Sequence, residues 1–264
     1  MERPKTALAP LIVLVCLLSV VCAHADDTVE LVNNLKNDDP AVRIRAIKAL
    51  GGTRDPRAFD PIRTMLYDKD PGVRRVATHV LAVGGDRRAL GALVEVLQDK
   101  YAGDQRVNTA YALRYIKGSG AVDALVSVLK DENPELGRMA ANTLGFIGDR
   151  RALGPLLEVL KDESSGGPRA GAAFAIGRIG GREALEPLLA ALKDRDPAVR
   201  LSASQALGNI GGKNAIEPLI DALKDEDPGV RMGVSLALTG MTGLDMGEDH
   251  GIWRTWWEDN KDRF

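Results

Sequence analysis

Apolar residues recur along the chain at steps of three and four, the spacing that places side chains on one face of an α-helix. In the stretch 196–211 they are Val199, Ala203, Ala206, Leu207 and Ile210. The same pattern returns every 31 or 32 residues and closes each time on an aliphatic residue: Leu50, Leu81, Leu113, Leu144, Ile176, Leu207 and Leu238. A fixed period in this range is typical of an array of helical repeats.

Each of these helices has a recognisable beginning and end. Aspartate stands before the apolar pattern, as at Asp70 and Asp196, where its carboxylate can accept hydrogen bonds from the free N–H groups of the first turn. Proline follows at the first helical position, which needs no N–H group. Glycines at the far end, such as Gly208 and Gly211, predict that the helix stops there.

A second apolar pattern lies between the capped helices. It occupies residues 29–35, 58–66, 89–97, 121–129, 152–160, 184–192 and 215–223. We expect the prolines within it, Pro61, Pro155, Pro187 and Pro218, to fall in the first helical turn, where proline is tolerated. Two helices in each period predict an antiparallel helix pair per repeat and an all-α protein.

These repeats resemble the bacterial HEAT repeat of the phycobilisome-lyase-like type. The resemblance rests on the recurring pattern Ala-Leu-x-Pro-Leu-Leu-x-x-Leu-Lys-Asp followed by Asp-Pro-x-Val-Arg-x-x-Ala-x-x-Ala-Leu-Gly, and covers about residues 28–240. It implies an α-solenoid of about seven helix pairs whose second helices line the concave side. We assign residues 26–240 to the solenoid and residues 241–264 to a separate C-terminal segment.

The first 25 residues have the composition of a secretory signal peptide. Arg3 and Lys5 precede an apolar run over residues 11–21, and Ala-His-Ala at 23–25 offers a cleavage site. The run is shorter than the roughly 20 residues of a spanning helix. We expect cleavage after Ala25, export to the periplasm or beyond, and a mature chain without a membrane span. Lipidation of Cys22, or an uncleaved anchor, stays open as an alternative.

Composition narrows the range of partners. The formal net charge is −2, which gives no general attraction to nucleic acid. Both cysteines, Cys16 and Cys22, lie in the signal segment, so no disulfide is expected in the mature chain. We therefore expect the partner to be another protein, of unknown identity, and we predict no cofactor. The sequence does not determine the oligomeric state.

An arginine recurs at one position of the capped helices. It is present at Arg43, Arg74, Arg106, Arg169, Arg200 and Arg231, and Gly137 takes its place in one repeat. A cation near a helix N-terminus is mildly unfavourable, so the arginine needs a partner. The aspartates that end the other helices, Asp131, Asp162, Asp194 and Asp225, could supply one. We expect a structural ladder between repeats; a groove for anionic peptides or phosphate is the alternative.

The binding face follows from the helical wheel of the capped helices. Positions six and two before each closing aliphatic residue point away from the buried stripe. Their residues vary greatly, while the caps and stripe repeat closely. As partner-binding residues we select Arg75, His79, Tyr111, Arg138, Asn142, Phe174 and Gln205. Tyr111 and Phe174 are favoured, because aromatic residues and arginine are enriched at interface hot spots.

The sequence offers little for catalysis. Outside the signal only His79 and His250 remain, and there is neither a cysteine nor a His-Glu pair. HEAT-like deoxyhypusine hydroxylase holds iron through His-Glu pairs, so this resemblance implies no such site here. The compact group Asp245, Glu248, Asp249 and His250 is better explained as a polar turn before a helix than as a metal site. We therefore predict no enzyme and no metal.

The C-terminal segment 241–264 carries all three tryptophans, Trp253, Trp256 and Trp257. Their i, i+3, i+4 spacing places them on one helical face. We expect a helix that caps the exposed end of the solenoid; an exposed aromatic docking site is the alternative.

The sequence as a whole predicts a non-catalytic protein-binding scaffold or adaptor of the cell envelope, which binds its partner on the concave face. A chromophore lyase or lyase subunit, and a purely structural spacer, are the alternatives.

Overall fold

The computed structural model describes residues 27–263, apart from 54, 117 and 163–165. Every regular element in these ranges is a helix, which confirms the predicted all-α class. The expected signal peptide, its cleavage site after Ala25, and Cys16 and Cys22 lie outside the described residues. The chain forms two compact units that meet between Val96 and Leu97, and each unit is described by itself.

The first unit contains a helical stretch at 27–34 and two helix pairs. Its elements are α2 (Pro40–Thr53), η1 (Pro56–Ala58), α3 (Phe59–Thr64), η2 (Met65–Tyr67), α4 (Pro71–Val83) and the beginning of α5 (Ala89–Gln98). Helices α2 and α4 pack against each other. Ile47 and Leu50 of α2, together with Val73 and Ala77 of α4, are buried in the core, as the apolar stripe predicts.

The second unit continues the alternation. Its elements are η3 (Lys100–Ala102), α6 (Asp104–Ala112), η4 (Leu113–Tyr115), α7 (Ser119–Ser127), α8 (Pro134–Ile147), η5 (Arg150–Ala152), α9 (Leu153–Lys161), α10 (Gly166–Ile179), η6 (Arg182–Ala184), α11 (Leu185–Ala191), α12 (Pro197–Ile210), α13 (Lys213–Ala222), α14 (Pro228–Thr242) and α15 (His250–Asn260). The helix α14 thus continues past residue 240, where we had placed the end of the solenoid.

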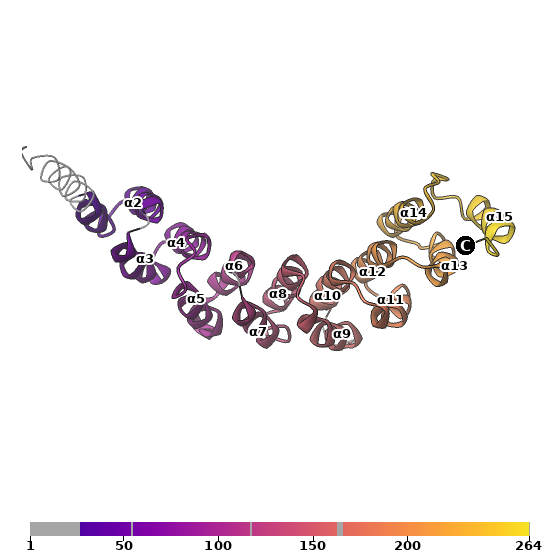
Figure 1. Ribbon diagram of the computed structural model, residues 1–264, viewed down its shortest axis with the longest axis horizontal. Helices are drawn as coiled ribbons and strands as arrows, with labels where there is room; N and C mark the ends of the chain where they lie inside the picture. Colours follow the sequence, from indigo (N-terminus) through magenta and orange to yellow (C-terminus); the bar gives the residue numbers. More distant parts are fainter. Residues whose placement is uncertain (1–26, 54, 117, 163–165, 264) are drawn as a thin grey trace, which may run out of the picture. The chain divides into compact units, whose positions relative to one another are not determined.

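Helices of the second unit form two layers. The even-numbered helices α6, α8, α10, α12 and α14 pack side by side in sequence order, and α11 contacts α9 and α13 in the other layer. Within this unit the even-numbered helices lie on the inner side of the curve, as Figure 1 shows. Leu144, Ile176, Leu207 and Leu238 are fully buried between the layers. This arrangement confirms the α-solenoid.

The helix starts are capped by the side chains that the sequence indicates. Asp70 accepts a hydrogen bond from the backbone N–H of Val73 at 3.0 Å, and Asp227 from that of Val230 at 3.0 Å. Asp39 and Asp196 accept from residues two further along. Asn133 does the same for α8, where the sequence has no aspartate at this position. Each cap satisfies an N–H group that the helix itself leaves without a partner.

The prediction for the helix ends was partly wrong. The first glycine of each Gly-x-x-Gly pair lies within its helix, because α8, α10 and α12 continue to Ile147, Ile179 and Ile210. A Cβ atom on Gly177 would lie 2.5 Å from the Cα atom of Ala206, so this glycine lets neighbouring helices approach closely. The second glycine, such as Gly211 with φ of 74°, ends the helix.

One proline also departs from expectation. Pro61, Pro155 and Pro187 each lie in the first turn of a helix that a 3₁₀ turn precedes. Pro218 instead lies inside α13, because this helix begins directly at Lys213. The predicted position of Pro218 was therefore wrong.

Candidate functional site

A run of aromatic side chains crosses three neighbouring inner helices of the second unit. The rings of Tyr111 and Tyr115, from α6 and η4, meet edge to face with centroids 6.5 Å apart. Phe146 of α8 and Phe174 of α10 are tilted against each other at 5.7 Å. Tyr111 is 41% and Phe146 is 48% exposed. Large exposed rings gathered on one face mark an interaction surface more strongly than single exposed apolar residues do.

Two arginines join these rings into one strip. The guanidinium carbon of Arg114 lies 4.5 Å from the Tyr111 centroid, 4.8 Å from that of Tyr115 and 5.3 Å from that of Phe146. That of Arg178 lies 4.9 Å from Phe146 and 5.8 Å from Phe174. We call Tyr111, Arg114, Tyr115, Phe146, Phe174 and Arg178 the aromatic–arginine strip. All its contacts are within cation–π range.

The local fold places Arg114 on this strip. Arg114 directly follows the closing Leu113, where α8, α10 and α12 have Gly145, Gly177 and Gly208. A Cβ atom at Gly145 would come within 2.7 Å of the Cα atom of Ala175, so these positions accept no side chain. The third repeat avoids that conflict because α6 ends at Ala112 and the chain tightens into η4. Its arginine can therefore lie on the surface.

A hollow opens beside the strip. It has a volume of about 280 Å³, and Arg138, Asn142, Phe146, Phe174 and Ser202 are among the side chains that line it. Its lining is apolar on the side of the two rings and polar on the side of Asn142 and Ser202. Arg138 is held at the rim by Glu135, with a shortest N–O distance of 2.6 Å. The hollow thus combines apolar surface with an amide and a hydroxyl group.

The structure brings some of the predicted partner-binding residues together. Tyr111 and Phe174 lie on the strip, and Arg138, Asn142 and Phe174 line the hollow. Gln205 is exposed on α12 but lines neither feature. Arg75 and His79 lie on α4 in the first unit, both exposed.

Sequence reasoning missed Arg114, Phe146 and Arg178 as site residues. Phe146 and Arg178 follow their closing aliphatic residues by two positions, one helical turn after the positions that we selected. The selection missed them because it took only the positions six and two before each closing residue.

The recurring arginines lie elsewhere, between successive repeats, and form what we call the arginine–aspartate ladder. Arg106 donates two hydrogen bonds to Asp131, at 3.1 and 2.6 Å, and a third to the carbonyl of Leu97. The same pairing, always across 25 residues, joins Arg43 to Asp68, Arg169 to Asp194 and Arg200 to Asp225. Arg231 instead contacts Glu248 at 3.3 Å, and Arg74 donates to the carbonyl of Asp68.

Ladder aspartates have two partners each. Asp131 also accepts the backbone N–H of Asn133 at 3.0 Å, and Asp225 that of Asp227 at 2.9 Å. The hydrogen bond from Arg106 holds the pKa of Asp131 below its ordinary value, although burial opposes this. Burial acts to raise the pKa of Asp225, but its bonds to Arg200 and to the N–H of Asp227 outweigh that effect and lower it.

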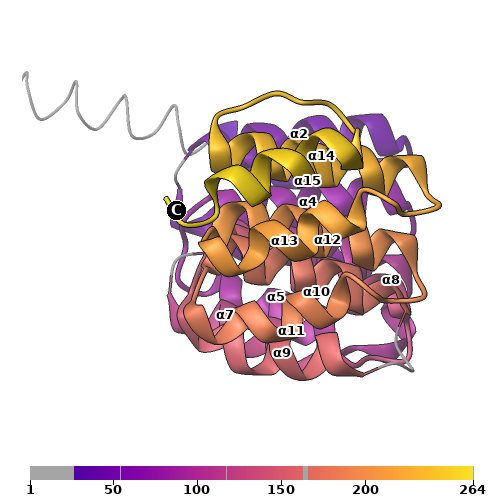
Figure 2. The same ribbon diagram turned by 90° about the vertical axis from the view of Figure 1, so that its right-hand side faces the viewer.

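At the C-terminal end α15 packs against α13, as Figure 2 shows. Trp253 is fully buried and donates from its indole nitrogen to the Gly247 carbonyl at 2.9 Å. Trp257 is 4% exposed, and Trp256 is half-buried. Arg254 binds both Glu217 and Asp221 of α13. The three tryptophans therefore do not share one environment.

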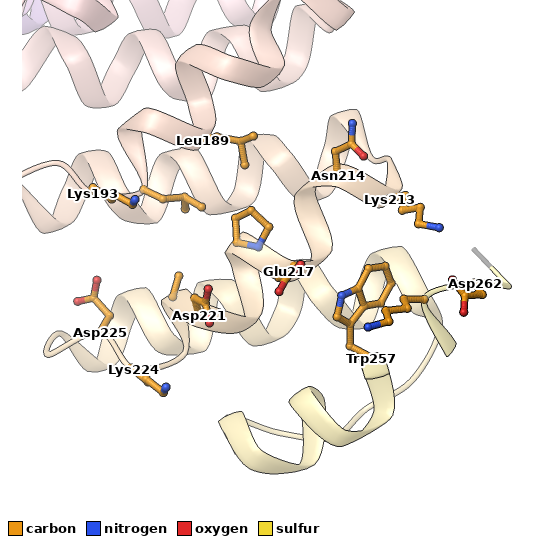
Figure 3. A pocket seen from close by; sticks show the side chains of 14 residues that line it. Leu189, Lys193, Lys213, Asn214, Glu217, Asp221, Lys224, Asp225, Trp257 and Asp262 are labelled. Atoms are coloured by element: carbon orange, nitrogen blue, oxygen red, sulfur yellow. The ribbon is translucent and has the colours of Figure 1, made fainter. Parts of the chain in front are cut away.

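A pocket of about 830 Å³ lies between α11, α13 and α15. Figure 3 shows Trp257 pointing from α15 towards α13, with Lys213, Glu217 and Asp221 at the wall. Its lysines and carboxylates are equal in number: Lys193, Lys213, Lys224 and Lys261 against Glu217, Asp221, Asp225 and Asp262. The pocket consequently has no marked charge preference.

The polar group before α15 has structural partners. Asp249 caps α15 through the N–H of Ile252 at 3.0 Å, and Asp245 accepts the N–H of Gly247 at 3.2 Å. Glu248 contacts Arg231, and His250 lies 3.8 Å from Asp221. Across the described ranges no three such side chains converge in a way that could hold a metal ion. Nor does any helix in this part of the chain have the length and apolarity to span a membrane.

Comparisons with known proteins find similarity over the helical repeats. A family model described as HEAT repeats matches residues 28–114, 102–175 and 155–239. No curated protein matches the chain. Among solved structures, YibA of Escherichia coli is similar at 21% identity with a TM-score of 0.55, over 73% of this chain and 72% of that one. At this identity the likeness concerns the fold alone.

Two further similar structures are enzymes by name. Human deoxyhypusine hydroxylase in complex with glycerol has 21% identity and a TM-score of 0.46, over 92% of this chain and 99% of that one. The CpcE–CpcF complex of phycocyanin lyase from Nostoc sp. PCC7120 has 24% identity and a TM-score of 0.45, over 88% and 93%.

These two structures overturn the prediction that the protein is not an enzyme. That prediction rested on the lack of cysteine and of His-Glu pairs, which argues against thiol and histidine-metal chemistry only. A HEAT-repeat fold does not by itself determine whether a protein is an enzyme.

Proposed function

The chain belongs to the HEAT-repeat family, and on that premise we propose that it is a scaffold that binds a partner protein through the aromatic–arginine strip. The single observation that carries this proposal is a set of four packed rings and two arginines on adjacent inner helices, of which Tyr111, Tyr115 and Phe146 are exposed. Aromatic residues and arginine dominate the energetics of protein interfaces. The inner side of the second unit offers such a partner a continuous surface.

The polar surroundings support a protein partner as well. The hollow between Phe146 and Phe174, of about 280 Å³, lies at the lower end of the roughly 300–1,000 Å³ of small-molecule pockets. It has room for one side chain of a partner. The hydroxyl of Ser202 and the amide of Asn142 at its wall can bond to a partner's backbone.

We test this proposal with a photo-crosslinking amino acid placed at Phe146. The matched control carries the same amino acid at Tyr101, which is 99% exposed but takes part in no ring contact of the strip. We expect a crosslinked protein partner from position 146 and not from position 101. Equal crosslinking from both positions, or none from 146, would contradict the proposal.

Affinity measurements with the partner so identified give a second test. Tyr111→Ala, Phe146→Ala and Phe174→Ala should each weaken binding by about 1–4 kcal/mol, while Tyr101→Ala should leave it unchanged. A bilin that stays attached to the captured complex would instead favour a chromophore lyase. Capture of neither protein nor bilin would favour a structural spacer.

We also propose that the protein is exported. Support comes from the basic start, the apolar run and the Ala-His-Ala site of residues 1–25. The intact mass of the cellular protein should correspond to a chain that begins at Asp26. A mass that includes lipid on Cys22 would contradict simple cleavage and would place the protein on a membrane surface.

A further inference from the structure

The charge on the aromatic–arginine strip is unbalanced. Arg114 and Arg178 form no ion pair with any carboxylate in the described part of the chain; Arg178 donates only to the Gly145 carbonyl, at 3.0 Å. Their guanidinium carbons lie 5.3 and 4.9 Å from the same Phe146 centroid. Two like charges thus lie against one ring, and neither forms an ion pair among the described residues.

From this we infer that the strip recognises an acidic segment of the partner, in which carboxylate side chains stand next to an aromatic residue. The inference rests on the proposed function and specifies the partner of that same site. A carboxylate beside each guanidinium group would neutralise its charge, and hydrogen bonds between charged groups are among the stronger ones. The neighbouring aromatic side chain would enter the hollow between Phe146 and Phe174.

Surrounding residues are consistent with an anionic ligand. Asp149, which lines a hollow together with Arg114 and Phe146, is bound to Arg151 at 2.8 Å. Glu135 of α8 is bound to Arg138 through two hydrogen bonds of 2.9 and 2.6 Å. The rings of the strip hold the two arginines in place, so little conformational freedom would be lost on binding. The strip thus offers positive charge, aromatic surface and a side-chain hollow in one place.

A single-stranded nucleic acid also combines negative charge with rings, but the observations favour a peptide. Nucleic acid binding requires a positive groove that follows the phosphate backbone over several nucleotides. Here Arg114 and Arg178 lack a carboxylate, whereas Arg138 on the same face is neutralised. The net charge of the chain is −2, which disfavours a polyanion as partner.

The experiment uses defined polymers and the double variant Arg114→Met/Arg178→Met. Its matched control, Arg87→Met/Arg182→Met, removes two exposed arginines from outside the strip and changes the net charge equally. Affinities for a random copolymer of glutamate and tyrosine, for one of lysine and tyrosine, for polyglutamate and for oligothymidylate are measured by biolayer interferometry.

We expect the glutamate–tyrosine copolymer to bind best and the lysine–tyrosine copolymer not to bind. The strip variant should bind the first polymer at least about tenfold more weakly, since a charge-assisted hydrogen bond is worth about 1.5–3 kcal/mol and 1.4 kcal/mol is tenfold. The control variant should bind like the wild type. Polyglutamate should bind more weakly than the copolymer, because it has no ring.

Three outcomes would overturn the inference: equal binding by strip variant and wild type, preference for the lysine–tyrosine copolymer, or tighter binding of oligothymidylate. Selection from a library of random peptides separates this failure from failure of the proposed function. If neutral or basic peptides are enriched and Phe146→Ala abolishes their binding, the strip binds proteins but not acidic ones. If Phe146→Ala changes nothing in the selection, the proposed function itself fails.

Discussion

Two sets of arginines in the second unit have opposite surroundings. Arg106, Arg169 and Arg200 of the ladder are buried, and each is bound to an aspartate of the next repeat. Arg114 and Arg178 of the strip lie at the surface against aromatic rings, without a carboxylate. Burial explains the difference, because a charge removed from water needs a partner of opposite sign, whereas an exposed one is solvated.

The difference separates structural from functional charge in a repeat protein. The ladder arginine recurs at one position in six repeats, and Arg43, Arg106, Arg169 and Arg200 each pair with the aspartate 25 residues further along. The strip arginines occupy different positions, one and two residues after the closing aliphatic residue. A charge that breaks the repeat and lacks a partner is therefore the better candidate for binding.

The largest loss of stability is expected when one arginine of the arginine–aspartate ladder is replaced. Arg200→Met leaves Asp225, whose side chain is 10% exposed, as a charge without its main partner. The free energy of unfolding should fall by about 3–5 kcal/mol, the range for removing one member of a buried pair. Urea denaturation followed by circular dichroism measures this. If Arg200→Met loses no more stability than Arg178→Met, the ladder arginines are no more important for stability than the strip arginines, and the comparison fails.

The ladder should also make stability depend on pH. Asp131 and Asp225 have a pKa lower in the folded protein than their ordinary 3.8, so they stabilise the fold above that value. This contribution is lost as the pH falls through the lower folded pKa. The melting temperature should therefore drop steeply below about pH 4. Arg200→Met/Asp225→Asn should show a shallower drop, and an unchanged slope would contradict the argument.

An intermediate loss of stability is expected when Arg254 is replaced. Like the ladder arginines it pairs with carboxylates, and like the strip arginines it is accessible to solvent. It pairs with Glu217 and Asp221, yet its side chain is 29% exposed and both carboxylates are more exposed still. Water can solvate all three groups if the contact is lost. Arg254→Met should therefore cost only about 1 kcal/mol, near the upper limit for surface ion pairs. Thermal melting measures this loss of stability. A loss similar to that of Arg200→Met would show that solvent exposure does not determine how much an ion pair stabilises the fold.

The smallest effect on stability is expected for the strip. Arg114→Met and Arg178→Met should each change the free energy of unfolding by no more than about 0.5 kcal/mol, as surface substitutions usually do. Urea denaturation alongside Arg200→Met gives a direct comparison. A large loss in either variant would mean that the strip holds the helices together and is no free binding surface.

The fold could be predicted from the sequence because the same apolar stripe and helix cap recur in successive repeats. The stripe that ends at Leu207, the cap at Asp196 and the partition into helix pairs all follow from local spacing. The prediction for the helix ends was wrong for the first glycine of each pair. A glycine that ends a helix and a glycine that lets a neighbouring helix approach closely cannot be told apart from local sequence. Gly177 is of the second kind, as its approach to Ala206 shows.

The helical-wheel selection also left out half of the strip. Tyr111 and Phe174 were selected because they lie two residues before a closing aliphatic residue. Phe146 and Arg178 lie one turn further along the same face, after that residue. Arg114 depends on the early end of α6 at Ala112, for which the sequence has no local signal. The composition of the strip therefore depends on how the helices are placed in the fold, which the spacing of residues in the sequence does not determine.

Gly137 replaces the ladder arginine in α8, so the fourth repeat contributes no arginine to the ladder at its junction with the fifth. A Cβ atom there would lie 2.6 Å from the Leu129 carbonyl oxygen, and Gly145 meets Ala175 across the same junction. In a nearest-neighbour model of a linear array, each junction contributes its own coupling energy. At this junction close backbone packing takes the place of a buried ladder pair, and the pair of Arg151 with Asp123, at 3.5 Å, is exposed. When low pH weakens the buried pairs of the ladder, α8 and α10 should therefore remain one cooperative unit and unfold last.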